Sequence, residues 1–288
     1  MNKIPESKKQ ELAVVIPVYK NKITSDERIS FDRCLSILND YQIILVAPEH
    51  LDLDVYLNND INKVRKIKIY QFNKKFFRNI SGYNKLMLSR IFYEKFLEYK
   101  YILIYQLDAM IFSDNLLDWC SMNYDYVGAP WVINYFLNLQ GLDAQNSCLK
   151  FLGVGNGGFS LRKVQSFLGV LDSKNIFQDH YISGMFNPFY GLKYLFLVRL
   201  LLEIKKYIKE INFLNIFLFF YQGNEDIFWS YYVKFFTTSF TIADINTALD
   251  FAYECCPQGC FEYNNQQLPL GCHGWNKYDR EFWIKFLH

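Results

Sequence analysis

Residues 101–108, YILIYQLD, decide how this chain is expected to fold. Six of the first seven residues are apolar or aromatic, which is typical of a strand buried on both faces of a sheet. A carboxylate, Asp108, follows directly. Ligands of open α/β sheets bind at the carboxyl ends of the strands, so Asp108 stands where a functional side chain is expected.

The sequence before this stretch alternates between strand and helix patterns. Short apolar runs at 12–18, 42–47 and 66–72 predict strands, and apolar spacing at 30–38 and 84–99 predicts helices. This order indicates an α/β fold with a Rossmann-like mixed sheet flanked by helices. The exit of the first strand, at Val18 and Tyr19, should lie close to Asp108.

Composition limits the classes of function. The 288 residues carry 31 Lys+Arg and 29 Asp+Glu, a net charge of +2, and nucleic-acid binding needs a stronger basic field. We therefore expect no nucleic-acid partner. The start, MNKIPESKKQ, lacks the apolar run of a signal peptide, which favours a cytoplasmic location. We predict one domain over residues 1–288.

Residues 189–221 form an apolar segment interrupted by basic and acidic side chains. It has no uncharged run of the 18 or so residues that a spanning helix needs. We interpret it as a helical insertion within the domain. Two hypotheses remain for it: core helices, or a peripheral contact with the inner face of the membrane.

Four further features could carry chemistry, and each has a structural alternative. Asp108 could bind a divalent cation or cap a turn. The glycines of residues 153–158 could cradle a substrate or allow a tight turn. Glu225 and Asp226 could supply a general base or favour a helix N-terminus. His273 could ligate a metal ion or be a satisfied structural histidine.

In this order, the features resemble the glycosyltransferase-A (GT-A) fold family. That family has an Asp-x-Asp motif, a glycine loop, an x-Glu-Asp motif and a C-terminal metal-binding His. The segments YDYVGAPW (124–131), GNGGFSLR (155–162), NEDIFW (224–229) and GCHGW (271–275) more narrowly resemble a bacterial group of glycosyltransferases found with surface-polysaccharide genes.

The resemblance implies roles for individual residues. Asp108 and His273 would ligate Mn²⁺ or Mg²⁺, Asp226 would be the base of an inverting reaction, and Glu225 would contact acceptor or sugar. Gln106 replaces the first motif aspartate and weakens the metal site. The residues expected to bind donor or acceptor are Val18, Tyr19, Gln106, Gly155, Asn156, Gly157, Gly158, Phe159 and Trp275.

The resemblance therefore implies transfer of a sugar from a nucleotide-sugar donor to a glycan or lipid-linked acceptor in surface-polysaccharide synthesis. A non-catalytic nucleotide- or carbohydrate-binding module on the same fold is the alternative, and Gln106 favours it. A nucleotidyltransferase is a second alternative, but it would carry a basic glycine-rich signature after Val18, and none is present.

Overall fold

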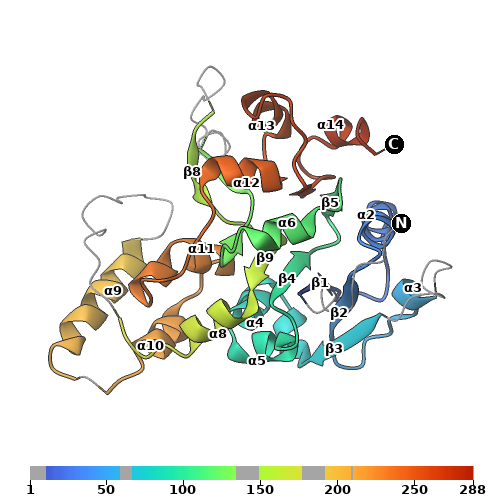
Figure 1. The fold of residues 1–288 in the computed structure, drawn as a ribbon. Helices are drawn as coiled ribbons and strands as arrows, with labels where there is room; N and C mark the ends of the chain where they lie inside the picture. Colours follow the sequence, from blue (N-terminus) through green and yellow to red (C-terminus); the bar gives the residue numbers. More distant parts are fainter. Residues whose placement is uncertain (1–10, 59–66, 134–148, 177–191, 209, 288) are drawn as a thin grey trace.

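A computed structural model describes residues 11–58, 67–133, 149–176, 192–208 and 210–287. Its centre is a six-stranded sheet in the order β3-β2-β1-β4-β9-β6 (Figure 1). The strands are β1 (Leu12–Pro17), β2 (Gln42–Pro48), β3 (Lys68–Phe72), β4 (Tyr101–Tyr105), β6 (Tyr126–Val127) and β9 (Phe159–Lys163). The first four run parallel, while β9 is antiparallel to β4 and β6. The predicted mixed sheet is confirmed.

Both faces of the sheet are covered, which explains why its central strands are continuously apolar. Along β1, Ala13 and Val15 enter one hydrophobic cluster, and Val14 and Ile16 enter the other. Successive side chains of a strand point to opposite faces. A strand in this position therefore needs apolar side chains at every residue.

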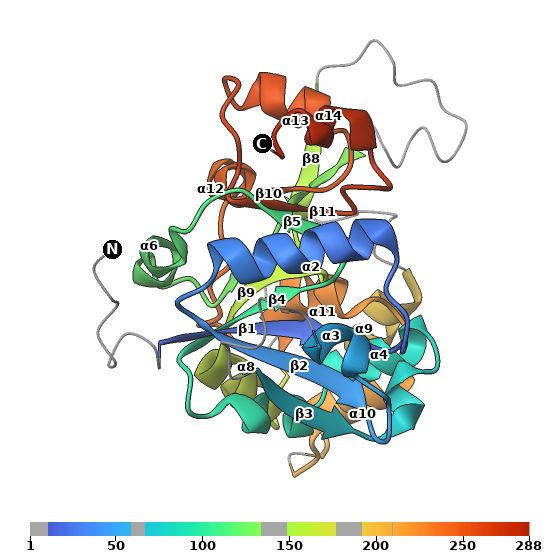
Figure 2. The same cartoon turned by 90° about the vertical axis from the view of Figure 1, so that its right-hand side faces the viewer.

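Different helices cover the two faces. Figure 2 shows α2 on one side of the parallel strands, with α4, α8 and α10 on the other. The first side carries α2 (Ser25–Ile37), α3 (Asp54–Leu57) and α6 (Leu116–Ser121). The second carries α4 (Ile80–Met87), α5 (Arg90–Tyr93), α8 (Val164–Leu171), α9 (Leu192–Lys205), α10 (Phe213–Phe220) and α11 (Glu225–Ser230), with the 3₁₀ turns η2 (Lys74–Phe77), η3 (Glu94–Phe96) and η6 (Tyr232–Phe235).

Helix α2 begins five residues before the segment that we predicted as helical. Thr24 and Glu27 form a capping box, in which the Glu27 amide donates to Thr24 Oγ1 at 3.2 Å and the Thr24 amide donates to Glu27 Oε2 at 2.8 Å. A cap of this kind contributes about 1 kcal/mol. The start of α2 is therefore set by polar capping. The spacing of apolar residues contains no information about such a cap.

The single helix predicted over 84–99 is wrong. The chain forms α4, then α5 and η3, with a break at Leu88 and Ser89. The Ser89 hydroxyl donates to the Leu86 carbonyl at 2.6 Å. Serine side chains compete in this way for backbone groups that a continuous helix would use.

The C-terminal segment folds back onto the end of β4. Here β5 (Ala109–Ile111), β11 (Gly271–His273) and β10 (Ala252–Tyr253) form a three-stranded sheet. Its register pairs His273 with Ala109, next to Asp108. Around it lie β7 (Pro130–Val132), β8 (Phe151–Val154), α12 (Ile245–Phe251), α13 (Pro257–Tyr263) and α14 (Arg280–Ile284). Residues far apart in the sequence thereby meet at one place.

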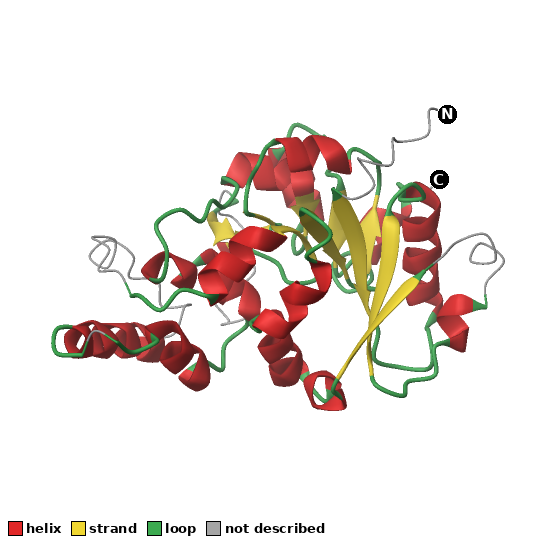
Figure 3. Ribbon diagram, turned by 60° about the horizontal axis from the view of Figure 1, so that its bottom comes forward, coloured by secondary structure: helices red, strands yellow, loops and turns green. Residues whose placement is uncertain are grey.

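The segment predicted as an insertion contains α9 and α10, which extend to one side of the sheet (Figures 1 and 3). Residues 189–191 and 209 lie outside the described residues. No helix in the described part of the chain is long and apolar enough to cross a membrane.

Candidate functional site

A cleft of about 840 Å³ opens at the carboxyl ends of β1 and β4. Nine of the residues predicted for the site line it: Val18, Tyr19, Gln106, Asp108, Gly157, Gly158, Glu225, Asp226 and His273. The expectation that the exit of the first strand lies near Asp108 is met. The cleft has two acidic walls, which differ in their buried cations.

The first wall, called here the histidine wall, consists of Gln106, Asp108, Glu254 and His273. His273 Nε2 lies 3.2 Å from Asp108 Oδ1 and 3.3 Å from Gln106 Oε1. On the opposite edge of the ring, Nδ1 lies 2.8 Å from Glu254 Oε1. The imidazole is therefore held between two carboxylates, one on each nitrogen.

The carboxylates control the charge of the imidazole. Burial lowers the pKa of His273, but the Asp108 and Glu254 carboxylates outweigh burial and raise this pKa to about 10. Burial raises the pKa of Asp108, and the charge on His273 more than offsets it, so that the pKa of Asp108 lies below its ordinary value. Without another cation, both groups are charged at neutral pH.

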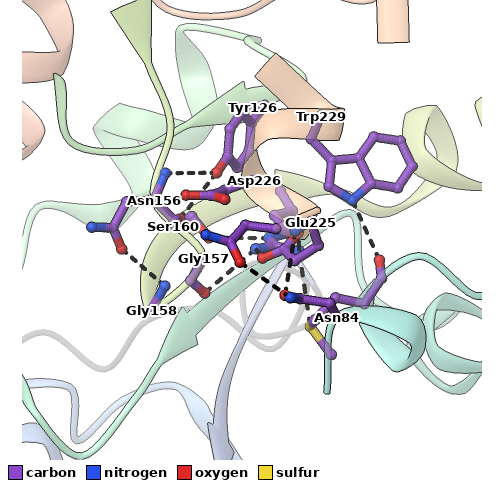
Figure 4. A network of polar contacts seen from close by, with 12 residues as sticks. Asn84, Tyr126, Asn156, Gly157, Gly158, Ser160, Glu225, Asp226 and Trp229 are labelled. Atoms are coloured by element: carbon purple, nitrogen blue, oxygen red, sulfur yellow. Dashed lines mark hydrogen bonds and ion pairs between the residues drawn. The ribbon is translucent and has the colours of Figure 1, made fainter. Parts of the chain in front are cut away.

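The glycine loop lets both walls approach the backbone closely. A Cβ atom at Gly157 would collide with Glu225 Oε1, and one at Gly158 would collide with the His273 ring. Asn156 holds the turn, because its Oδ1 accepts from the amides of Gly158 and Phe159, both at 2.9 Å (Figure 4). These glycines are needed because the side chains of Glu225 and His273 pack against them.

Asn156 also connects the loop to the histidine wall. Its Nδ2 lies 3.2 Å from His273 Nδ1, while its own backbone is fixed by the Tyr126 hydroxyl. Asn156 is 1 % exposed and Phe159 is fully buried. Of the loop residues predicted to bind donor or acceptor, Gly155, Asn156 and Phe159 therefore support the cleft from behind and do not line it.

The second wall, called here the arginine wall, consists of Asn84, Arg162, Glu225 and Asp226. Figure 4 labels Asn84, Glu225 and Asp226. Arg162 is fully buried, and its guanidinium forms a bidentate ion pair with Glu225 at 2.7 and 3.0 Å. The Tyr93 hydroxyl and Ser160 Oγ, each at 3.0 Å, accept further hydrogen bonds from Arg162. Glu225 is thereby held rigidly at the start of α11.

Asp226 follows Glu225 but lies in a different environment. No ion pair neutralises it among the described residues, and its Oδ1 accepts the amide hydrogen of Ile227 at 2.9 Å. Burial raises the pKa of Asp226 to about 7, and the Glu225 and Glu254 carboxylates act in the same direction. A carboxyl group with this pKa can exchange a proton at neutral pH.

The sequence interpretation missed three kinds of residue in or behind the cleft. Glu254 was not singled out, although it follows a short apolar strand just as Asp108 does. Arg162 was overlooked because a charged residue near a strand end usually indicates a solvent-exposed position. The basic side chains of Lys20, Arg78 and Lys277 also line the cleft, and no local motif marks them.

Trp275 is not brought to the cleft. Its indole is fully buried in the C-terminal cluster, and the guanidinium of Arg280 lies 5.3 Å from the ring centre. It cannot meet a sugar there, because none of its surface is exposed. Trp229 is also fully buried. Both of these tryptophans therefore serve the core.

The donor set of the histidine wall allows a metal ion at one position only. Asp108 and Glu254 lie on opposite edges of the His273 ring, so they cannot ligate one ion together, and no three His, Cys, Asp or Glu of the described residues form a metal cluster. At Nε2, however, Asp108 and the Gln106 amide oxygen supply two oxygen donors. Glu254 at Nδ1 matches the carboxylate that commonly orients a metal-bound histidine.

Comparisons with known proteins support the fold. The galactosyltransferase LgtC, solved with donor and acceptor sugar analogs, matches with a TM-score of 0.50 at 10% identity, covering 96% of this chain and 95% of LgtC. At this identity the likeness shows the fold alone, which is that of GT-A glycosyltransferases.

Two further solved structures are less similar. The glycosyltransferase GlyE of Streptococcus pneumoniae TIGR4 matches with a TM-score of 0.44 at 11% identity, covering 96% of this chain and 60% of GlyE. Mouse xyloside xylosyltransferase 1 matches with a TM-score of 0.43 at 10% identity, covering 92% and 97% of the two chains.

Sequence comparison gives one family. A search of curated proteins finds no match. The family model described as "Protein of unknown function (DUF5672)" matches residues 66–273, which is well over half of the chain and includes both walls of the cleft.

Proposed function

We propose that this chain, which belongs to the DUF5672 family, is a glycosyltransferase that moves a sugar from a nucleotide-sugar donor to a hydroxyl group of a glycan or lipid-linked acceptor. One observation carries the proposal. A carboxyl group with a pKa of about 7, Asp226, faces the same cleft as the Asp108–His273 pair at the end of β4. Proton removal and diphosphate binding thus have separate places in one cleft.

The histidine wall would hold the diphosphate of the donor. Asp108 and His273 Nε2, with the Gln106 amide oxygen, would ligate Mn²⁺ or Mg²⁺, and Glu254 would orient the ring. A divalent cation bound there would neutralise charge on the departing nucleoside diphosphate. Lys277, which also lines the cleft, would supply further positive charge.

The nucleoside would lie at the exit of β1. Val18 and Tyr19 line the cleft there, and Tyr19 is 56% exposed. A phenol ring in this position can pack against a base or a ribose. This placement puts the donor across the carboxyl ends of β1 and β4, which is where open α/β sheets bind nucleotides.

Asp226 would act as the general base of an inverting transfer. The acceptor hydroxyl must lose a proton as its oxygen attacks the anomeric carbon, and a carboxylate that titrates near neutral pH can accept this proton. Glu225 was predicted to contact acceptor or sugar. We instead assign it a positioning role, because its two carboxylate oxygens already bind Arg162.

The test is an assay of donor consumption. The full chain is incubated with Mn²⁺ and a panel of nucleotide sugars, and release of nucleoside diphosphate is followed. Many transferases hydrolyse their donor slowly, so we expect release from one class of donor even without the natural acceptor. Absence of release from every donor, together with tight binding of a nucleoside diphosphate, would contradict transfer and support the non-catalytic binding module that Gln106 favours.

A further inference from the structure

A second surface of the molecule, outside the cleft, is unusually apolar. On α9 and its end, Phe196 is 69%, Leu200 46%, Tyr207 86% and Ile208 49% exposed. At the end of α10, Phe219 and Phe220 are 81% and 55% exposed, with their rings 5.1 Å apart. We call these six residues the apolar hairpin surface. Figures 1 and 3 show the two helices extending to one side of the sheet.

The inner sides of the same helices are well packed. Tyr194, Val198 and Leu201 of α9 and Phe217 of α10 belong to the main hydrophobic cluster. A helix that is apolar on all sides is normally covered on all sides. Here packing against the core uses one side of each helix, and the exposed aromatic residues are more than that packing requires.

Charge identifies the kind of partner. Residues 192–220 contain five basic and two acidic residues, a net charge of +3, whereas the whole chain carries +2. The hairpin is therefore more basic than the chain as a whole. Lys193 and Arg199 are exposed on α9, on the same part of the helix as Phe196. This composition complements an anionic surface that also accepts apolar side chains.

We propose that the apolar hairpin surface docks onto an anionic lipid bilayer and lies in its interface. Phenylalanine and tyrosine side chains would enter the boundary between headgroups and acyl chains, while Lys193 and Arg199 would pair with lipid phosphates. The hairpin would not cross the bilayer, since no described helix is long enough.

The hairpin is also connected directly to the cleft. Four residues separate α10 from α11. The backbone amide of Gln222 donates a hydrogen bond to the Tyr194 hydroxyl at 3.0 Å, and the Tyr221 hydroxyl donates one to the Asn224 carbonyl at 2.7 Å. Docking would therefore hold the arginine wall close to the bilayer. Resting on the function proposed above, this placement favours a lipid-linked acceptor over a free glycan.

The experiment is flotation of the full chain with vesicles, in the absence of any donor, so that its result does not depend on catalysis. Vesicles of phosphatidylcholine alone are compared with vesicles that contain about a quarter of phosphatidylglycerol. We expect the wild type to float with the anionic vesicles. A variant with Phe196→Ser, Phe219→Ser and Phe220→Ser should lose about tenfold or more in partitioning.

A matched variant controls for general loss of surface hydrophobicity. Ile91→Ser, Leu97→Ser and Met122→Ser change three residues that are 48%, 53% and 49% exposed on other parts of the molecule, and binding should stay at the wild-type level. Lys193→Gln with Arg199→Gln should weaken binding to the anionic vesicles only. Circular dichroism checks that each variant is folded.

Two outcomes would overturn the proposal. Failure of the wild type to float with either vesicle excludes bilayer docking, as does unchanged flotation of the folded Phe196, Phe219 and Phe220 variant. Sedimentation velocity without vesicles tests the other occupant. If the wild type is a dimer and the variant at Phe196, Phe219 and Phe220 is a monomer, this surface binds a second copy of the chain instead of a bilayer.

Discussion

The two walls of the cleft both bury a cation among carboxylates, but the cations differ in kind. In the histidine wall, an imidazole lies between Asp108 and Glu254, and an imidazole can exchange its proton for a metal ion. In the arginine wall, the guanidinium of Arg162 stays charged at all accessible pH values. The first arrangement can bind and release a ligand, and the second holds its neighbours in place.

The contrast continues within the arginine wall, at two adjacent residues of α11. Glu225 is neutralised by Arg162, which donates a hydrogen bond to each of its carboxylate oxygens. Asp226, one position further, keeps a raised pKa in the cleft. The permanent cation therefore fixes one carboxylate in an ion pair, and the adjacent carboxyl group is the one to which we assign proton transfer.

The largest expected effect comes from Asp226→Asn, which removes the proposed base but keeps the shape of the side chain. We expect the transfer rate to fall by about 10²–10⁴-fold, with nucleoside diphosphate affinity nearly unchanged. Turnover kinetics and calorimetry measure the two quantities. Glu225→Asp is not a suitable control, because it disturbs the ion pair with Arg162. The control is Asp244→Asn, at the N-cap of α12 and outside the cleft, which should keep wild-type turnover. Full activity of Asp226→Asn would remove the residue from the mechanism.

Arg162→Met should have the next largest effect, on folding. It leaves the Glu225 carboxylate buried without its partner, and loss of one member of a buried ion pair costs about 3–5 kcal/mol. Urea unfolding measures the change in the free energy of unfolding. The double variant Arg162→Met with Glu225→Met should recover much of the loss, because no charge is then buried alone. Equal destabilisation in the single and double variants would argue against a structural ion pair.

Glu254→Gln tests the histidine wall, where a carboxylate holds the imidazole of His273. An amide keeps the hydrogen bond to His273 Nδ1 but lacks the charge, and loss of such an orienting carboxylate typically lowers metal affinity by about 10–100-fold. Titration with Mn²⁺, followed by calorimetry, measures this. Glu262→Gln, on α13 and outside the cleft, serves as the control. An unchanged Mn²⁺ affinity would show that Glu254 does not support a metal ligand.

The pH dependence of turnover should report Asp226. Because the pKa of this carboxyl group is raised to about 7, it is protonated below neutral pH and cannot accept the acceptor's proton. The rate should therefore rise with pH and level off above about 7, falling roughly tenfold per unit on the acidic side. A profile that stays flat from pH 5 to 8 would be inconsistent with Asp226 as the titrating base.

The sequence predicted the central strands well, because their apolar runs follow directly from burial on both faces. Asp108 could be predicted as a site residue for the same reason, because it follows an apolar run of this kind. The histidine wall as a whole could not be derived, because it depends on the pairing of β11 with β5, which joins residues more than 150 positions apart. Local patterns contain no information about that register.

The arginine wall was still harder to predict from the sequence. Arg162 stands in FSLRK, which gives no sign that a charge is buried there, and its partner lies 63 positions away. Trp275 shows the opposite error: it was expected to bind donor or acceptor, but its ring fills the C-terminal core. The break between α4 and α5 was missed because one serine hydroxyl interrupts an otherwise continuous apolar pattern.

In the proposed enzyme, one cleft holds both a cation at Asp108 and His273 and a nucleoside diphosphate. The most direct test is a crystal structure of the full chain with Mn²⁺ and a nucleoside diphosphate, using the anomalous signal of manganese. We expect a manganese peak within about 2.3 Å of Asp108 Oδ1 and His273 Nε2, with the diphosphate in the same cleft. A diphosphate bound elsewhere, or one in this cleft with the manganese away from both residues, would contradict it.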